Sequence, residues 1–183
     1  RLRFAYKKIS EKNKELYTLA NMDSLTKIRN RRKYFIESKA LLEKAITNNQ
    51  NFDIAIIDID NFKKINDKFG HSVGDEVLIT FCDIVNGLID KNIPFGRIGG
   101  EEFCITFYDK KEDEVNEICE NIRKKCEKYN LNIDGVFLTF TISLGLSSKN
   151  NPNETIDKIL QRADALLYEA KNSGKNRLIR RVE

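Results

Sequence analysis

Two pairs of acidic side chains have the type and spacing for carboxylate and metal chemistry. Asp58 and Asp60 end an apolar run rich in β-branched residues, and Glu101 and Glu102 follow a pair of glycines. Because strand side chains alternate between two faces, both aspartates are expected on one face. If a turn brings the glutamates beside that strand, up to four carboxylates converge, and such hard oxygen ligands suit Mg²⁺ or Mn²⁺. The competing interpretation is that strand ends and hairpin tips are simply polar.

A lysine-rich segment follows the first acidic pair. Residues 61–71 include Lys63, Lys64 and Lys68 among few apolar positions, and lysines beside a carboxylate-held metal can neutralise phosphate oxygens. A solvated turn is the alternative interpretation of the same residues. His71, the only histidine, is interpreted as a hydrogen-bonding loop residue and not as a base.

The sequence argues against several other kinds of site. A Walker phosphate loop needs a glycine five positions before the glycine of its Gly-Lys pair. Glu169 stands there before Gly174 and Lys175, and Asn176 replaces the Ser or Thr. The GxGxxG and GxSxG patterns are absent, and a single histidine argues against His-based triads. The four cysteines form no CxxC pair, so we expect buried free thiols in a reducing, cytoplasmic setting.

The composition is that of one globular domain with one extra element. Of 183 residues, 33% are charged and 40% hydrophobic. Lys and Arg number 32 against 28 Asp and Glu, a net charge of +4 that does not indicate a nucleic-acid partner. No run approaches the roughly 20 apolar residues of a membrane span. The chain starts at Arg1, so we interpret it as a fragment, with membrane contact only through a preceding region, if at all.

The apolar periodicity predicts helices alternating with strands, interrupted by one hairpin. The expected helices cover residues 1–20, 31–47, 75–90, 112–128 and 154–172, and the expected strands cover 52–59, 95–98, 103–108, 136–146 and a short edge at 177–179. Asp23 or Ser24 is expected to cap the helix that follows. The predicted fold is α/β (α+β), a ferredoxin-like mixed sheet flanked by helices. The predicted division is a connecting helix at 1–22 and one domain at 23–183.

The first helix carries an apolar stripe with alternating spacings of three and four residues. Its members are Leu2, Ala5, Ile9, Lys12, Leu16 and Leu19, with Lys12 as the break. This spacing is typical of a coiled-coil seam. An ordinary amphipathic helix packed on the domain surface is the open alternative.

The string Arg97-Ile98-Gly99-Gly100-Glu101-Glu102-Phe103 resembles the signature of the GGDEF family of diguanylate cyclase domains. Other motifs resemble the family in the same order, namely Asp23-Ser24-Leu25-Thr26 with Asn30-Arg31-Arg32, the segment 58–75, Thr141 to Gly145, and Ala163 to Asn176. The resemblance runs from Asp23 to about Arg177. It implies a fold like the palm of nucleotidyl cyclases and polymerases. It also implies a nucleotidyltransferase that joins two GTP into cyclic di-GMP and releases two pyrophosphates.

The resemblance also implies roles for individual residues. Mg²⁺ or Mn²⁺ would be held by Asp58, the Ile59 carbonyl and Glu101, and Glu101 or Glu102 would assist deprotonation, with Glu101 favoured. The implied substrate-binding residues are Phe62, Lys63, Asn66, Asp75, Lys171 and Lys175. Asn66 and Asp75 would contact guanine, and the others the phosphates. Because the product has two-fold symmetry, a homodimer is expected to form it, each domain holding one GTP.

Two positions depart from the family pattern. The RxxD product-binding site is replaced by Asp90-Lys91-Asn92-Ile93, so no product-inhibition site is expected. Lys175 stands where the family usually has arginine, which keeps the charge and loses the bidentate fork. Two alternatives to an active cyclase are a module that only binds GTP or a partner, and an enzyme making mixed guanine–adenine dinucleotides. The intact carboxylates argue against the first, and Asp75 argues against the second.

Overall fold

The computed structural model describes residues 2–181, apart from the side chains of residues 2, 4 and 136. Its elements, in chain order, are α1 (Leu2–Asn21), β1 (Arg29–Asn30), α2 (Arg31–Thr47), β2 (Phe52–Ile59), α3 (Phe62–Phe69), α4 (His71–Asn86), β3 (Phe95–Arg97), β4 (Glu102–Tyr108), α5 (Glu112–Glu127), β5 (Leu131–Ile133), β6 (Val136–Leu138), β7 (Ile142–Ser148), α6 (Ile156–Asn172) and β8 (Leu178–Arg180). The first helix is predicted to start at Arg1 and to include Leu2 in its apolar stripe. Residue 1 and the Leu2 side chain lie outside the described part of the chain.

One mixed sheet forms the centre of the domain, with strand order β1-β3-β4-β2-β7-β8. The central strand β2 pairs antiparallel with β4 and β7, while β8 adds to β7 in parallel. All eight residues of β2 are buried, as expected for an apolar strand covered on both faces. The predicted mixed sheet with flanking helices is confirmed.

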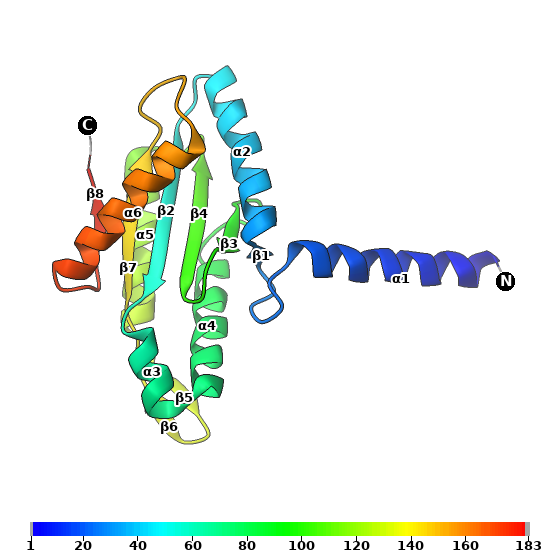
Figure 1. The fold of residues 1–183 in the computed structure, drawn as a ribbon, viewed down its shortest axis with the longest axis horizontal. Coiled ribbons are helices and arrows are strands. Elements are labelled where there is room, and N and C mark those ends of the chain that lie inside the picture. The colour runs from blue at the N-terminus through cyan, green and yellow to red at the C-terminus, as the bar shows by residue number, and fades with distance from the viewer. Residues whose placement is uncertain (1, 182–183) are drawn as a thin grey trace.

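Helices cover both faces of this sheet (Figure 1). One apolar cluster joins the sheet to α4 and α5 and includes Phe81, Phe95 and Phe103, and the other joins it to α2 and α6. The α6 helix packs against β7 at Gly145, where an added Cβ would lie 2.0 Å from the Ala163 carbonyl oxygen. A glycine is therefore required at this crossing.

The structure corrects several predicted elements. The segment 62–69, interpreted as polar and turn-like, forms α3, and the next helix begins at His71, which is therefore not a loop residue. The predicted strand 136–146 is divided into β6 and β7, and β6 pairs with β5 in a separate hairpin. Asn30, not Asp23 or Ser24, caps α2 by accepting from Lys33 N.

The first helix extends away from the domain as an isolated rod (Figure 1). Its apolar side chains are in water, with Ile9 60%, Leu16 61% and Leu19 72% exposed. The alternative that α1 packs on the domain surface is therefore wrong. No helix in the described residues is long and apolar enough to cross a membrane.

The four cysteines are buried free thiols, as predicted. They are Cys82, Cys104, Cys119 and Cys126. Burial raises the thiol pKa of Cys82, Cys119 and Cys126 to about 12. Such thiols stay protonated and pack as small apolar groups.

Candidate active site

Asp58 lies at the end of the central strand, where β2 leaves the sheet. It pairs in register with Glu102 of β4 and is only 6% exposed. The pKa of Asp58 is raised to about 6, mainly by burial and in addition by the charges of Glu101 and Glu102. A hydrogen bond and ion pair with Lys171, whose Nζ lies 2.7 Å from Oδ2, act in the opposite direction. The carboxylate is thus poised beside two other acids and one cation.

The turn between β3 and β4 delivers the two glutamates to this end of β2 (Figure 1). The Ile59 amide donates to the Glu101 carbonyl oxygen at 3.4 Å, which anchors the turn to the central strand. Glu102 folds under Gly99, since a Cβ built there would lie 2.6 Å from Glu102 Oε2. Glu101 and Glu102 are both half-buried.

Arg97 ties the same turn to the segment that follows α1. Its Nη2 donates to the Gly100 carbonyl oxygen at 2.6 Å, and its Nη1 donates to Asp23 Oδ1 at 3.1 Å. Asp23 Oδ1 also accepts from the amide and hydroxyl of Thr26. Burial raises the pKa of Asp23, but these hydrogen bonds outweigh it and the net shift is downward. Sequence reasoning missed this clamp because Asp23 and Arg97 are far apart along the chain.

Asp60 does not join the acidic cluster, which corrects the expectation of four converging carboxylates. Its Oδ1 accepts from Ser143 Oγ at 2.7 Å, and its Oδ2 accepts from Thr141 Oγ1 at 2.7 Å and from Asn176 N at 3.0 Å. The side chain is only 4% exposed. These donors occupy both oxygens, so Asp60 is committed to the fold.

The start of α3 provides unpaired backbone donors beside the carboxylates. Asn61, with a left-handed φ of 56°, precedes the helix, and Phe62 and Lys63 form its first turn. The first amides of a helix lack intrahelical acceptors and carry the positive end of its dipole. Lys175 Nζ reaches this terminus and donates to Asn61 Oδ1 at 2.6 Å. With Lys171 on Asp58, these groups form a surface suited to phosphate.

A buried carboxamide oxygen without a hydrogen-bond partner in the described part of the chain lies where α3 meets α4. Asn66 Oδ1 is buried and has no hydrogen-bond partner among the described residues. A Cβ at Gly74 would lie 1.9 Å from that oxygen, so the glycine leaves room for the carboxamide. Asp75, the next residue, is exposed on α4. An unpaired buried acceptor is costly, and it indicates a donor supplied by a ligand.

The residues at the end of β2 fit a hard divalent cation. Asp58 is flanked by the negative charges of Glu101 and Glu102, and carboxylate oxygens are the ligands that Mg²⁺ and Mn²⁺ prefer. No set of three or more His, Cys, Asp or Glu side chains in the described residues is gathered closely enough to hold a metal ion. A cation at this end of β2 would therefore need ligands besides these side chains, such as substrate phosphates.

The turn at 90–93 contacts Arg29 of β1. Arg29 Nη1 and Nη2 lie 3.4 Å from the carbonyl oxygens of Ile93 and Lys91, which they contact as donors. The Asp90 carbonyl accepts from Ile93 N at 2.9 Å. The turn is thus held by backbone contacts, and the expected absence of a product-inhibition site there stays a prediction.

The sequence of the chain is similar to those of known proteins. The family model "Diguanylate cyclase, GGDEF domain" matches residues 20–177. A diguanylate cyclase of Vibrio cholerae is 37% identical over 169 residues, covering 92% of this chain and 52% of that protein. Diguanylate cyclase A of Treponema denticola is 32% identical over 173 residues, covering 93% of this chain and 47% of that protein. The chain spans about half the length of these relatives.

Solved structures share the fold over most of its length. The coiled coil and GGDEF domain of DgcB from Caulobacter crescentus, in complex with c-di-GMP, matches with a TM-score of 0.89 at 26% identity, covering 96% of this chain and 93% of that one. The active GGEEF domain of a diguanylate cyclase from Vibrio cholerae matches with a TM-score of 0.77 at 34% identity, covering 84% of this chain and 98% of that one.

Proposed function

The chain belongs to the diguanylate cyclase GGDEF domain family, and we propose that it condenses two GTP into cyclic di-GMP. In each half-reaction a ribose 3′-hydroxyl of one nucleotide attacks the α-phosphorus of the other. A new P–O bond forms, the bond to the β-phosphate breaks, and pyrophosphate leaves. The observation that carries the proposal is the juxtaposition of Asp58, Glu101 and Glu102 with the open amides at the start of α3. Incubation with GTP and Mg²⁺, followed by chromatography of the products, tests it.

We assign Asp58, Glu101 and the Ile59 carbonyl to a divalent cation, Mg²⁺ or Mn²⁺. When bound, such a cation lowers the pKa of the attacking hydroxyl and stabilises the leaving oxygen. Glu101 is the favoured group to take the hydroxyl proton, with Glu102 as its neighbour. Lys171, now paired with Asp58 at 2.7 Å, is free to move to phosphate once cations neutralise that carboxylate.

The triphosphate is assigned to the start of α3 and two lysines. The amides of Phe62 and Lys63 point their positive ends to the phosphates, and Lys171 and Lys175 supply charge. Lys175 already reaches the helix start through Asn61. The groups come from α3, α6 and the loop after α6, so folding is needed to assemble them.

Guanine selection is assigned to Asn66 and Asp75. The unpaired Asn66 Oδ1 can accept from guanine N2–H, and the Asp75 carboxylate can accept from guanine N1–H and N2–H. Adenine has no donors at these positions, so a site built around these acceptors rejects it strongly. This disfavours mixed guanine–adenine products.

Replacing Gly74 with alanine is expected to raise the KM for GTP by about tenfold, with a smaller effect on kcat. The added methyl group would lie 1.9 Å from Asn66 Oδ1 and displace the carboxamide. Gly87→Ala is the matched control, because a Cβ there meets only ordinary contacts at 3.5 Å. Steady-state kinetics with GTP measure both variants. An unchanged KM in Gly74→Ala would contradict the role of Asn66.

We propose that residues 1–22 form a connecting helix and 23–183 a catalytic domain. Two domains must meet to form a two-fold symmetric product. The exposed stripe that includes Ile9, Leu16 and Leu19 has coiled-coil spacing and would pair two copies of α1. Paired helices raise the effective concentration of one domain near the other. The catalytic domain is proposed to be cytoplasmic.

Deleting residues 1–20 is expected to make specific activity depend steeply on protein concentration. The deletion removes the pairing helix and leaves the sheet and the site intact, so encounters become bimolecular. Specific activity measured across a hundredfold dilution series, alongside sedimentation, tests this expectation. Identical dilution curves for the full and shortened chains would exclude a role for α1 in dimer formation.

A further inference from the structure

We infer that Asp60 is a positioning residue that holds the loop after α6 so that Lys175 reaches the triphosphate. The inference rests on the proposed function of Lys175. It starts from the contacts of Asp60, which lies just beyond β2 and is 4% exposed. Three donors share its two oxygens, namely Thr141 Oγ1, Ser143 Oγ and Asn176 N. Two of these donors come from β7 and its preceding loop, and the third comes from the loop after α6.

The loop after α6 adopts a backbone that the chain would not hold unaided. Gly174, Lys175 and Asn176 have φ of 111°, 62° and 48°, three successive residues in the left-handed region. Only glycine adopts this region readily, so two of the three are strained. The Asn176 amide donates to Asp60 at 3.0 Å and the Lys175 amide donates to the Ala170 carbonyl at 3.0 Å. These bonds offset the strain.

The side chain of Asn176 fixes the other side of the loop. Its Oδ1 accepts from Arg123 Nη1 at 2.8 Å, and its Nδ2 donates to Glu127 Oε1 at 2.8 Å. Asn176 is therefore bonded to Asp60 through its backbone and to α5 through its side chain. The residue before it, Lys175, directs its ammonium group toward Asn61 Oδ1 at 2.6 Å.

The chemistry of the three donors explains why a carboxylate stands at this position. A carboxylate is an acceptor at both oxygens, whereas an asparagine amide offers one acceptor and two donors. In Asp60→Asn only one oxygen remains to accept from Asn176 N, and the hydroxyl that faces the new amide nitrogen must rotate and accept from it. A lysine lacks the bidentate guanidinium group of an arginine. Its binding to phosphate therefore depends on where the backbone places the ammonium group.

The test is calorimetric binding of two nucleotides in Mg²⁺, the α,β-methylene analogue of GTP, which resists turnover, and GMP. Asp60→Asn and Lys175→Ala are each expected to weaken analogue binding by about tenfold and to leave GMP binding unchanged, since GMP lacks the outer phosphates. The double variant is expected to bind no more weakly than Lys175→Ala alone, because one residue acts through the other. A purely structural role for Asp60 would weaken both nucleotides alike.

Asp53→Asn is the matched control. Asp53 lies at the other end of β2, is 3% exposed and also accepts from a serine hydroxyl, Ser148 Oγ at 2.7 Å. It is expected to bind the analogue as the wild type does. If Asp60→Asn does not fold, an α-hydroxy analogue of asparagine at position 176 removes only the N–H donor and should give the same loss.

Unchanged analogue affinity in the folded variant, equal losses for both nucleotides, or additive losses in the double variant would each overturn the inference. A wild-type chain that binds neither nucleotide would instead remove the proposed function itself. If the wild type binds the analogue and Asp60→Asn binds it equally well, only the positioning role of Asp60 is excluded.

Discussion

Asp58→Asn is expected to lower cyclic di-GMP synthesis by about three orders of magnitude while the domain stays folded. Asp58 is the buried carboxylate at the end of β2, beside Glu101 and Glu102 and bonded to Lys171. The amide keeps the size and most hydrogen bonds of the side chain but removes the charge that would hold a cation. Initial rates of product formation at saturating GTP and Mg²⁺ measure the loss.

The same substitution is expected to stabilise the metal-free chain. Burial raises the pKa of Asp58 to about 6 from an ordinary value of 3.8, so the folded state binds this proton more tightly than the unfolded state. Above pH 6 the ionised carboxylate therefore weakens the fold, and its removal at pH 7.5 should raise the free energy of unfolding by about 3 kcal/mol. Thermal unfolding with a chelator present measures this change.

Asp53→Asn serves as the control for activity. Asp53 pairs with Arg180 at 2.8 Å, and both side chains are at least nine-tenths buried. Burial raises the pKa of Asp53 as it does that of Asp58, but Asp53 lies at the other end of β2 from the site. We expect near-normal activity. Full activity in Asp58→Asn, or loss of activity in both variants, would contradict the role of Asp58.

Glu101→Gln is expected to lower kcat by at least about a hundredfold with little change in Tm. The hydrogen bond from Ile59 N to the Glu101 carbonyl fixes the turn through the backbone, so the side chain can change without moving it. The amide neither holds a cation nor accepts the proton of the attacking hydroxyl. Rates of pyrophosphate release under single-turnover conditions separate this loss from a change in binding.

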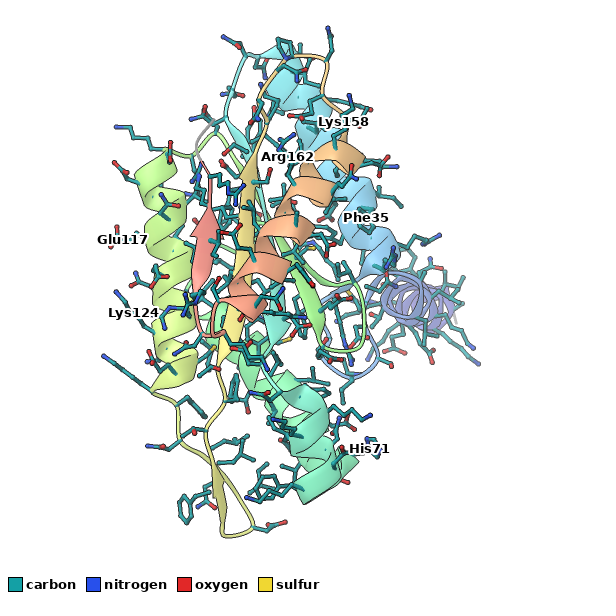
Figure 2. The ribbon with its side chains drawn as sticks, turned by 60° about the vertical axis from the view of Figure 1, so that its left-hand side comes forward. Phe35, His71, Glu117, Lys124, Lys158 and Arg162 are labelled. Atoms are coloured by element: carbon teal, nitrogen blue, oxygen red, sulfur yellow. The ribbon has the colours of Figure 1, made fainter. Side chains whose placement is uncertain are left out.

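Two further variants sharpen the result. Glu102→Gln should cost less, because Glu102 folds under Gly99 and is less directly placed to take the proton. Glu117→Gln, on the exposed side of α5 (Figure 2), should behave as the wild type. Retained turnover in Glu101→Gln would remove its assigned role, and a larger loss in Glu102→Gln would transfer that role to Glu102.

The sequence predicts two elements to the residue, whereas α4, expected at 75–90, runs from His71 to Asn86. β2 and α2 have the expected bounds, 52–59 and 31–47, because a continuous β-branched run and a capped amphipathic run have few alternatives. The α3 helix was missed since it is only eight residues long with three lysines and few apolar residues. Its stability comes from packing on α4, which sequence patterns do not report.

The missed hairpin had a signal in the sequence. Asp134 and Gly135 both take positive φ, 49° and 85°, and this dipeptide is typical of a two-residue hairpin turn. It joins β5 to β6 ahead of the predicted strand 136–146, and that strand is itself interrupted at residues 139–141, between β6 and β7. The β-branched and aromatic run that follows the dipeptide favoured the prediction of one continuous strand over that of a hairpin.

The position of Asp60 could not be predicted from strand periodicity. The alternation that places Asp58 and Asp60 on one face holds only while the strand continues, and β2 ends at Ile59. Asn61 then takes a left-handed φ of 56°, and the chain turns into α3. The partners of Asp60 lie more than 80 residues later in the chain, so only the folded structure shows that its oxygens are occupied.

The central claim is that this chain makes cyclic di-GMP from GTP. The most direct test incubates the chain, shown by sedimentation to be dimeric, with GTP and Mg²⁺ and resolves the products by chromatography with a pyrophosphate assay. We predict cyclic di-GMP with two pyrophosphates for each product molecule, and none with Asp58→Asn. A dimeric wild-type sample that binds GTP and forms no cyclic dinucleotide would contradict the account and indicate a binding module.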